Sequence, residues 1–303
     1  MSEYRPVGKL PNALLIGVQK AGTTSLFDWI AQHPQVYSNL GVKDYPFFWY
    51  DGTYQKGVEG IAQWFREAKG QPVLLAGNVN DIFFNTVPQR IFALNPDMRL
   101  IVSLRNPIER AYSAYVYAVE RGLETRTFSE AIRQEMNNIN YEDVVEQSQK
   151  CYLAHGMYWS QIERYLTYFN RSQIHVVLFE DIRDDRLKVI RDIYKFLRID
   201  ENFIPEFRKK NETKGEARFS QLNKILFNYA LHPPWWYQFA LRLIPAQTRY
   251  KIRGMIGTLN RKKTNIPPLD TEAIQILSGY FRREVEQTSM FVGRDLKLWQ
   301  RQK

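Results

Sequence analysis

The strongest constraint on the fold lies near the N-terminus, where an apolar run, a glycine-containing loop and a helical pattern follow one another without a gap. Residues 13–18 read Ala-Leu-Leu-Ile-Gly-Val, which is typical of a parallel strand buried on both faces. Residues 20–25 form the loop, and Leu26, Phe27 and Ile30 then repeat at helical spacing. The pattern predicts a strand–loop–helix unit, the building block of a parallel α/β sheet.

The loop of this unit is suited to hold a phosphate. A helix that starts directly after a buried strand presents backbone N–H groups and the positive end of its dipole to an anion. Gly22 allows the backbone to approach a phosphate closely. Hydroxyl donors follow at Thr23, Thr24 and Ser25. We therefore expect an anion site at residues 20–25.

The same loop differs from a nucleoside-triphosphate P-loop in the place of its lysine. In that motif, G-x-x-x-x-G-K-[ST], lysine directly follows the second glycine. Here Gly17 and Gly22 have the required spacing, but Thr23 occupies the lysine position. The positive charge lies three positions earlier, at Lys20. This displacement favours a ligand whose reacting group is not a γ-phosphate.

A second motif repeats the strand-to-helix pattern. Residues 99–104 form another buried strand pattern, which ends at Arg105, and Asn106-Pro107 is a good helix start. Ser113 lies about two turns further along the predicted helix, on the same side as its first residue. Arg105 and Ser113 can hold one phosphate together. An arginine paired with a neighbour and a packed serine would give the same pattern.

Length and composition fit one α/β domain. No Ser/Gly/Pro-rich linker divides the 303 residues, of which 44% are hydrophobic. We predict a single domain over residues 1–303 with a P-loop-like three-layer fold: a central parallel sheet flanked by helices, and a helical C-terminal part. The region of about residues 219–265 has the pattern of a helical insertion.

Charge and cysteine content narrow the partners and the compartment. The net charge of +10 favours an anionic partner, but it does not choose among nucleotide, nucleic acid, lipid and sulfated acceptor. The single cysteine, Cys151, excludes an intrachain disulfide, and no signal peptide or transmembrane run is evident. These features predict a cytoplasmic protein.

The two motifs together resemble those of the sulfotransferases that use 3′-phosphoadenosine 5′-phosphosulfate (PAPS). Residues 15–26 are similar to the 5′-phosphosulfate loop of that family, and Arg105-Asn106-Pro107 with Ser113 is similar to its 3′-phosphate motif. Shorter similarities extend along most of the chain. The branch that it resembles most contains heparan sulfate sulfotransferases and their bacterial relatives.

The resemblance implies a donor, a reaction and roles for several residues. The donor is PAPS, and in-line transfer delivers its sulfuryl group to a hydroxyl or amine, with no metal. Lys20 would stabilise the departing phosphate, which gains negative charge in the reaction. The 5′-phosphate would bind the segment Ala21, Gly22, Thr23, Thr24 and Ser25, and the 3′-phosphate would bind Arg105 and Ser113.

The base that accepts the proton of the acceptor is a position at which this chain departs from the resemblance. Relatives carry a glutamate where this chain has Asp44, which we expect to be the general base, desolvated by the aromatic run of residues 47–49. A turn residue at Asp44 is the competing interpretation. His155 is the second candidate. Relatives also have Glu-Lys-Thr-Pro or a similar segment before the second strand motif, where residues 76–80 read Ala-Gly-Asn-Val-Asn.

Two later segments are candidates for ligand contact. Lys214, Gly215 and Arg218 resemble the basic loop that closes over the nucleotide, although a solvated loop would have the same composition. Trp235 and Trp236 lie in a segment that mixes aromatic and basic residues. Such a segment is more often packed in a core, but it also suits peripheral contact with a membrane or a lipid-linked acceptor.

Two other functions remain as alternatives to a sulfotransferase acting on a carbohydrate, glycolipid or small molecule. Glu180-Asp181, after the strand pattern of residues 174–179, is similar to the metal-binding carboxylate of a kinase, while Thr23 argues against that class. A non-catalytic basic protein for nucleic acid or anionic membrane would also fit the charge. No nucleic-acid motif supports it, so we expect no nucleic-acid partner.

Overall fold

A computed structural model describes residues 9–39, 41–137, 144–207, 216–217, 261–262, 269 and 271–299. The chain forms two compact units. The first comprises Met1–Arg110, Leu153–Lys210 and Gln275–Lys303, and the second comprises Ala111–Tyr152 and Asn211–Ile274. The predicted insertion at residues 219–265 lies outside the described residues except for one short strand, and the prediction of a single domain stays a prediction.

The first unit is built on a parallel sheet of five strands in the order β2-β3-β1-β4-β5. The pairs β1·β3, β1·β4, β2·β3 and β4·β5 are all parallel, so the strands end at one edge. Every residue of β1 and β3 is buried, as expected for a sheet covered on both faces. The strands are β1 Ala13–Gly17, β2 Val36–Tyr37, β3 Val73–Gly77, β4 Arg99–Leu104 and β5 Ile174–Leu178.

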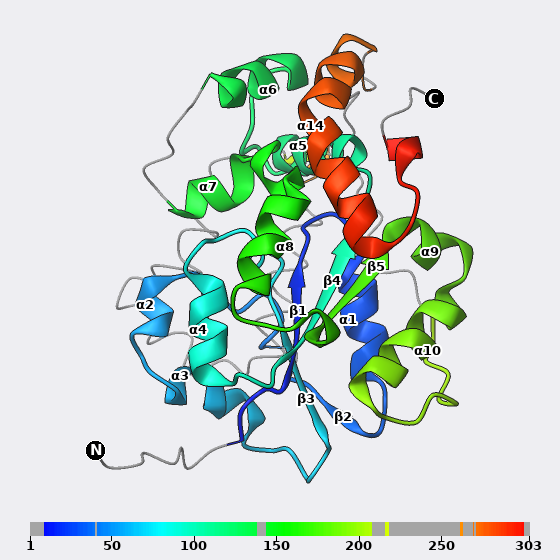
Figure 1. Ribbon diagram of the computed structural model, residues 1–303. Coiled ribbons are helices and arrows are strands. Elements are labelled where there is room, and N and C mark those ends of the chain that lie inside the picture. The colour runs from blue at the N-terminus through cyan, green and yellow to red at the C-terminus, as the bar shows by residue number, and fades with distance from the viewer. Residues whose placement is uncertain are drawn as a thin grey trace. The chain divides into compact units, whose positions relative to one another are not determined.

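Helices cover both faces of this sheet. Helices α1 and α10 lie together on one side of it, and α4 and α8 lie on the other (Figure 1). This arrangement confirms the predicted α/β class with a central parallel sheet flanked by helices. The helices of this unit are α1 Thr23–Ala31, α2 Asp51–Tyr54, α3 Glu59–Ala62, α4 Val87–Leu94, α8 Tyr158–Leu166, α9 Phe179–Asp184, α10 Arg186–Leu197 and most of α14 Thr271–Val292.

The two strand-to-helix patterns fold as the sequence predicts. The first gives β1 and α1, and the residues that α1 buries include Leu26, Phe27 and Ile30. The second gives β4 and α5 Pro107–Glu120. The Asn106 side chain accepts hydrogen bonds from the N–H groups of Ile108 at 3.0 Å and Glu109 at 3.4 Å, so it caps α5.

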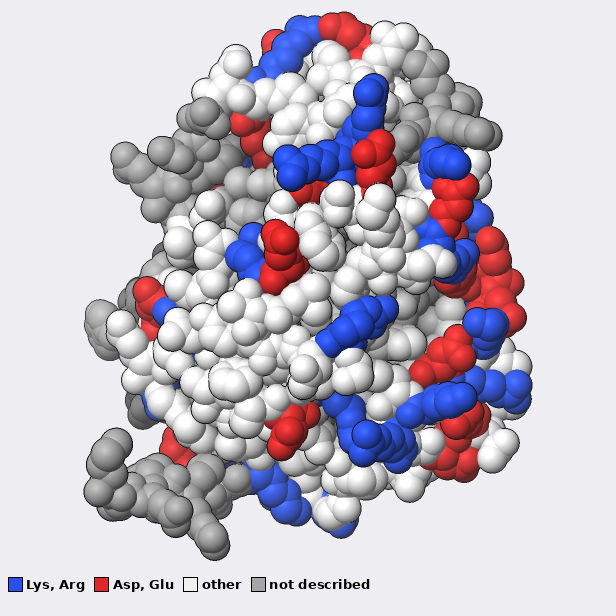
Figure 2. All heavy atoms as spheres, viewed as in Figure 1, with Lys and Arg blue, Asp and Glu red and all other residues white. Residues whose placement is uncertain are grey.

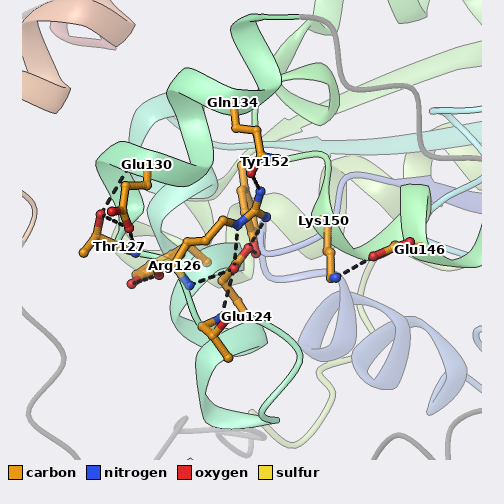
Figure 3. Close-up of polar contacts among 10 residues, drawn as sticks. Glu124, Arg126, Thr127, Glu130, Gln134, Glu146, Lys150 and Tyr152 are labelled. Atoms are coloured by element: carbon orange, nitrogen blue, oxygen red, sulfur yellow. Dashed lines mark hydrogen bonds and ion pairs between the residues drawn. The ribbon is translucent and has the colours of Figure 1, made fainter.

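The second unit continues α5 beyond residue 110 and adds α6 Phe128–Met136, α7 Val144–Lys150 and the antiparallel pair β6 Glu216–Ala217 and β7 Arg261–Lys262. A polar cluster is centred on Glu124, whose side chain is buried (Figure 3). Thr127 and Glu130 form a capping box at the start of α6.

Surface charge is mixed rather than concentrated where α9 and α10 face the viewer. Figure 2 shows lysine and arginine interleaved with aspartate and glutamate over these helices. Oppositely charged side chains on these helices form the ion pairs Arg183–Asp184 at 2.8 Å and Lys188–Asp192 at 3.0 Å. Within the described residues, no helix combines the length and the apolar character that a membrane crossing requires.

Candidate functional site

The loop between β1 and α1 has a backbone conformation that requires glycine at two positions, Gly17 and Gly22. A Cβ atom on Gly17 would lie 2.6 Å from the Ile82 side chain, so only glycine fits there. Gly22 has a φ of +78° and packs against Phe179, which a Cβ would approach to 3.1 Å. Lys20 also lies in the left-handed region, with a φ of +69°. The loop therefore turns tightly, with its backbone close to the sheet.

Strand β4 and the residue that follows it anchor this loop through three hydrogen bonds. The N–H of Val18 donates to the carbonyl of Ser103 at 2.9 Å, and the Ser103 hydroxyl donates to the carbonyl of Ala21 at 2.5 Å. Just beyond the strand, Nη1 of Arg105 donates to the carbonyl of Lys20 at 3.4 Å. The structure thus joins two residues that the sequence assigned to different phosphates, Lys20 and Arg105.

The start of α1 is the position at which the sequence predicts an anion site. Gly22 is the N-cap, and no side chain caps this helix among the described residues. Thr23 is buried, whereas Thr24 and Ser25 are half-buried beside it. An uncapped helix start, with a glycine that allows close approach, suits a phosphate. These residues fit the 5′-phosphate of the implied donor.

Arg105 is oriented by several contacts. Its Nη2 lies 3.1 Å from Glu109 Oε2, and its guanidinium lies 4.7 Å from the centre of the Phe179 ring. The Tyr158 hydroxyl donates to its carbonyl at 2.7 Å. Ser113 is half-buried on α5, in the second unit. Joint binding of one phosphate by Arg105 and Ser113 stays a prediction.

Asp44 lies in a turn after β2, beside Gly77, the last residue of β3. Its φ is +62°, and its N–H donates to the carbonyl of Gly77 at 2.7 Å. The turn interpretation therefore describes its backbone, which leaves the side chain available for another role. That side chain is 53% exposed and pairs with Lys43 at 2.6 Å. The expectation that residues 47–49 desolvate it is wrong, because these aromatic side chains pack into the core instead.

The other predicted residues are less accessible or lie outside the described part. His155 is 1% exposed, in a short 3₁₀ helix rather than at the start of α8. Its ring stacks on Phe83 with 4.0 Å between centroids. Lys214, Gly215 and Arg218 lie outside the described residues, as do Trp235 and Trp236.

Asp81 is a buried carboxyl group that the sequence motifs did not single out. It lies in the turn after β3, at the edge of the sheet where Asp44 also lies. Its side chain is 2% exposed, and its Oδ1 atom is buried without a hydrogen-bond partner among the described residues. Burial, and next the negative charge of Asp44, raise the pKa of Asp81 well above its usual range. The sequence does contain a feature that points to this residue. Asp81 directly follows the unusual segment of residues 76–80 and precedes the apolar residues 82–84.

The two carboxylates that favoured the kinase interpretation have partners in the C-terminal segment. Trp299 Nε1 donates to Glu180 Oε1 at 3.0 Å, and Asp181 pairs with Arg294. These contacts give both residues a structural role. In the part of the chain that the structure describes, no three His, Cys, Asp or Glu residues are grouped so as to hold a metal ion.

Comparisons with known proteins agree on one family. The profile of the sulfotransferase domain matches residues 10–223. A mouse bifunctional heparan sulfate N-deacetylase/N-sulfotransferase 4 is 27% identical over 314 residues, which cover 99% of this chain and 32% of that protein. Human heparan sulfate glucosamine 3-O-sulfotransferase 5 is 29% identical over 238 residues, covering 74% of this chain and 63% of that protein. The chain thus spans less than two thirds of the length of either relative.

Solved structures show the same fold. A sulfotransferase from Alicyclobacillus acidocaldarius superimposes with a TM-score of 0.67 at 23% identity, covering 97% of this chain and all of that one (100%). A mouse sulfotransferase complexed with PAP superimposes with a TM-score of 0.50 at 13% identity, covering 94% of this chain and 88% of that one. At these identities the likeness concerns the architecture.

Proposed function

Because the chain belongs to the sulfotransferase domain family, we propose that it transfers a sulfuryl group from PAPS to a hydroxyl or amine of a carbohydrate acceptor. The observation that carries this proposal is the loop between β1 and α1. Its lysine is displaced to Lys20, and the carbonyl of Lys20 accepts a hydrogen bond from Arg105. This contact brings together the residues proposed for two phosphates of one nucleotide.

Each residue of the proposed site either stabilises negative charge on the donor or accepts a proton from the acceptor. PAPS, when bound, supplies the activated sulfuryl group. The backbone and hydroxyls of residues 22–25 bind the 5′-phosphate, and the Lys20 ammonium neutralises the negative charge that develops on it. Arg105 and Ser113 bind the 3′-phosphate. Asp44 accepts the proton of the acceptor, and its half-exposed carboxylate is open to a ligand.

The acceptor class rests on the relatives. Two of them are named for heparan sulfate, a carbohydrate, and this supports a sugar hydroxyl or amino sugar as the acceptor. A lipid-linked sugar would also use the peripheral membrane contact predicted at Trp235 and Trp236. A cytoplasmic location and a reaction without metal belong to the same proposal.

A thermal-shift panel tests the proposed function. The desulfated nucleotide 3′-phosphoadenosine 5′-phosphate (PAP) should raise the melting temperature in the presence of EDTA, because a ligand stabilises the fold that binds it. ATP with magnesium should have the smaller effect. Stabilisation by ATP that depends on magnesium, without a response to PAP, would support the kinase alternative.

Arg105→Ala tests the assignment of the 3′-phosphate. Removal of a charge partner that the bound nucleotide would desolvate should weaken PAP binding by about 2–5 kcal/mol. The loss should nearly vanish with adenosine 5′-phosphosulfate, which lacks the 3′-phosphate. Arg66→Ala is the matched control, because the Arg66 side chain is 69% exposed in the same unit. Equal losses for both nucleotides would assign Arg105 a structural role.

A further inference from the structure

The turn that follows β3 connects the phosphate loop to the proposed base. Its segment of residues 78–82 packs directly on Gly17, whose Cβ would lie 2.6 Å from the Ile82 side chain and 3.1 Å from the Val79 carbonyl. The residue before this turn, Gly77, accepts the hydrogen bond from the Asp44 N–H. Any residue fixed in this turn is therefore adjacent to both functional elements.

Asp81 is fixed in this turn by its backbone. Its N–H donates to the Asn78 carbonyl at 3.2 Å, and its carbonyl accepts from the Tyr165 hydroxyl at 2.8 Å. The next N–H, that of Ile82, donates to the carbonyl of Ile16 in β1 at 2.9 Å. The position of Asp81 is thus determined by backbone contacts, and its side chain contributes none of them.

Among the described residues, no positive charge forms an ion pair with this side chain. Charged and titratable groups near the turn include Asp44 with Lys43, from the loop after β2, Arg164 and Tyr165, from α8, and His155, whose ring stacks on Phe83. Lys43 is engaged by Asp44, and Nη2 of Arg164 donates to the carbonyls of Ile82 and Phe83 at 3.1 and 2.8 Å. A carboxyl buried among such groups is disfavoured in its ionised form.

A buried carboxyl without a full set of partners destabilises a fold, and asparagine has nearly the same shape without the charge. Aspartate at this position is therefore unfavourable for stability. Groups of this kind concentrate at functional sites, where selection maintains them for activity. The location beside the phosphate loop and the base indicates which function is concerned.

We propose that Asp81 is a pH-sensitive group beside the transfer site, whose buried carboxyl remains protonated so that Asp44 is the single negative charge of the two. This inference rests on the proposed sulfotransferase function. The donor is strongly anionic, and a second carboxylate at this edge would repel it. Loss of the Asp81 proton, as the pH rises through its folded-state pKa, therefore weakens nucleotide binding and slows transfer.

The test is the pH dependence of PAP affinity, measured by calorimetry from pH 6 to pH 10 in the parent chain and in Asp81→Asn. The parent should lose affinity by about 3- to 10-fold at alkaline pH, the size of one additional charge interaction at moderate distance. Asp81→Asn cannot ionise, so its affinity should not show that decrease. Asp97 lies just before the start of β4, at the end of the strand away from this site. Asp97→Asn is the matched control, and its PAP affinity should show the same pH dependence as that of the parent.

Thermal unfolding provides a second, independent measurement. The folded-state pKa of Asp81 is raised, so its favourable contribution is complete below about pH 4 and is lost as pH rises through the folded pKa. Asp81→Asn should therefore melt at about the same temperature as the parent at pH 4, and several degrees higher at pH 8, because each pKa unit gained on folding is worth about 1.4 kcal/mol.

The outcomes separate this inference from the proposed function. Superimposable pH profiles for the parent and Asp81→Asn, or equal melting temperatures at pH 8, would overturn the role of Asp81. Failure of the parent chain to bind PAP at any pH would instead overturn the proposed function. The melting temperatures would in that case still report whether Asp81 holds a proton.

Discussion

Two buried carboxyl groups, Glu124 in the second unit and Asp81 in the first, have opposite surroundings. Glu124 is 5% exposed and Asp81 is 2% exposed. Glu124 Oε2 lies 2.5 Å from Arg126 Nη2 and 3.0 Å from the Tyr152 hydroxyl, while its Oε1 accepts from Arg126 Nε and from two backbone N–H groups (Figure 3). Asp81 Oδ1 has no such partner among the described residues.

The difference shows how burial and pairing compete. Burial by itself would raise the pKa of Glu124, but hydrogen bonds from the Arg126 side chain and backbone, its positive charge and the Thr125 N–H outweigh burial and lower that pKa. At Asp81 burial is unopposed, and Asp44 adds to it. We infer that the Glu124 cluster serves stability, whereas the edge of the sheet with Asp44 and Asp81 serves function.

The difference between these two regions can be tested by substitution, and the largest effect, on turnover, is expected at Asp44. Asp44→Asn removes the proposed general base, so kcat should fall by about 10²–10⁴-fold. The side chain is half-exposed and pairs only across the surface, so the melting temperature and PAP affinity should change little. Turnover would be measured with PAPS and a carbohydrate acceptor that the parent uses. Turnover within a few-fold of the parent would exclude Asp44 as the base and make His155 the next residue to test.

An intermediate effect is expected at Arg126, on stability alone. Arg126→Met leaves the buried Glu124 carboxylate without its charge partner and should lower the free energy of unfolding by about 3 kcal/mol. The lowered pKa of Glu124 gives stability that is present above its unfolded pKa and lost as pH falls through the folded pKa. The difference between parent and variant should therefore shrink in acid.

Chemical denaturation at pH 7 and in acid measures this effect, with PAP affinity as the second readout. Unchanged PAP affinity is expected for Arg126→Met. An equal loss of stability at all pH values would contradict the role given to the Glu124 ion pair.

The smallest effect is expected at Thr127, in the capping box of α6. The Glu130 N–H donates to Thr127 Oγ1 at 3.3 Å, and Thr127 N–H donates to Glu130 Oε2 at 2.8 Å. Thr127→Ala should lower stability by about 1 kcal/mol, with no effect on turnover. Thr127→Ser, which retains the hydroxyl, is the control. A loss as large as that of Arg126→Met would place the main support of this region in the helix cap rather than in the Glu124 ion pair.

Elements that depend on neighbouring residues could be predicted from the amino-acid sequence. The apolar run before Gly17 predicted β1, and Asn106-Pro107 predicted the start of α5, because periodicity and capping act over a few positions. The anion site predicted at the start of α1 was inferred from the same local chemistry. Lys20 and Arg105 were identified as candidates by their place after buried strands.

Long-range packing, in contrast, sets which of these groups meet and which are exposed. The hydrogen bond from Arg105 to the Lys20 carbonyl joins residues 85 positions apart. Asp44 remains half-exposed, although the aromatic residues after it suggested burial, because those side chains pack into the core. Asp81 is buried by a turn that depends on β1 and α8 together. Exposure and pairing are set by long-range packing, which local pattern does not contain, and they determine the ionisation on which the proposed chemistry depends.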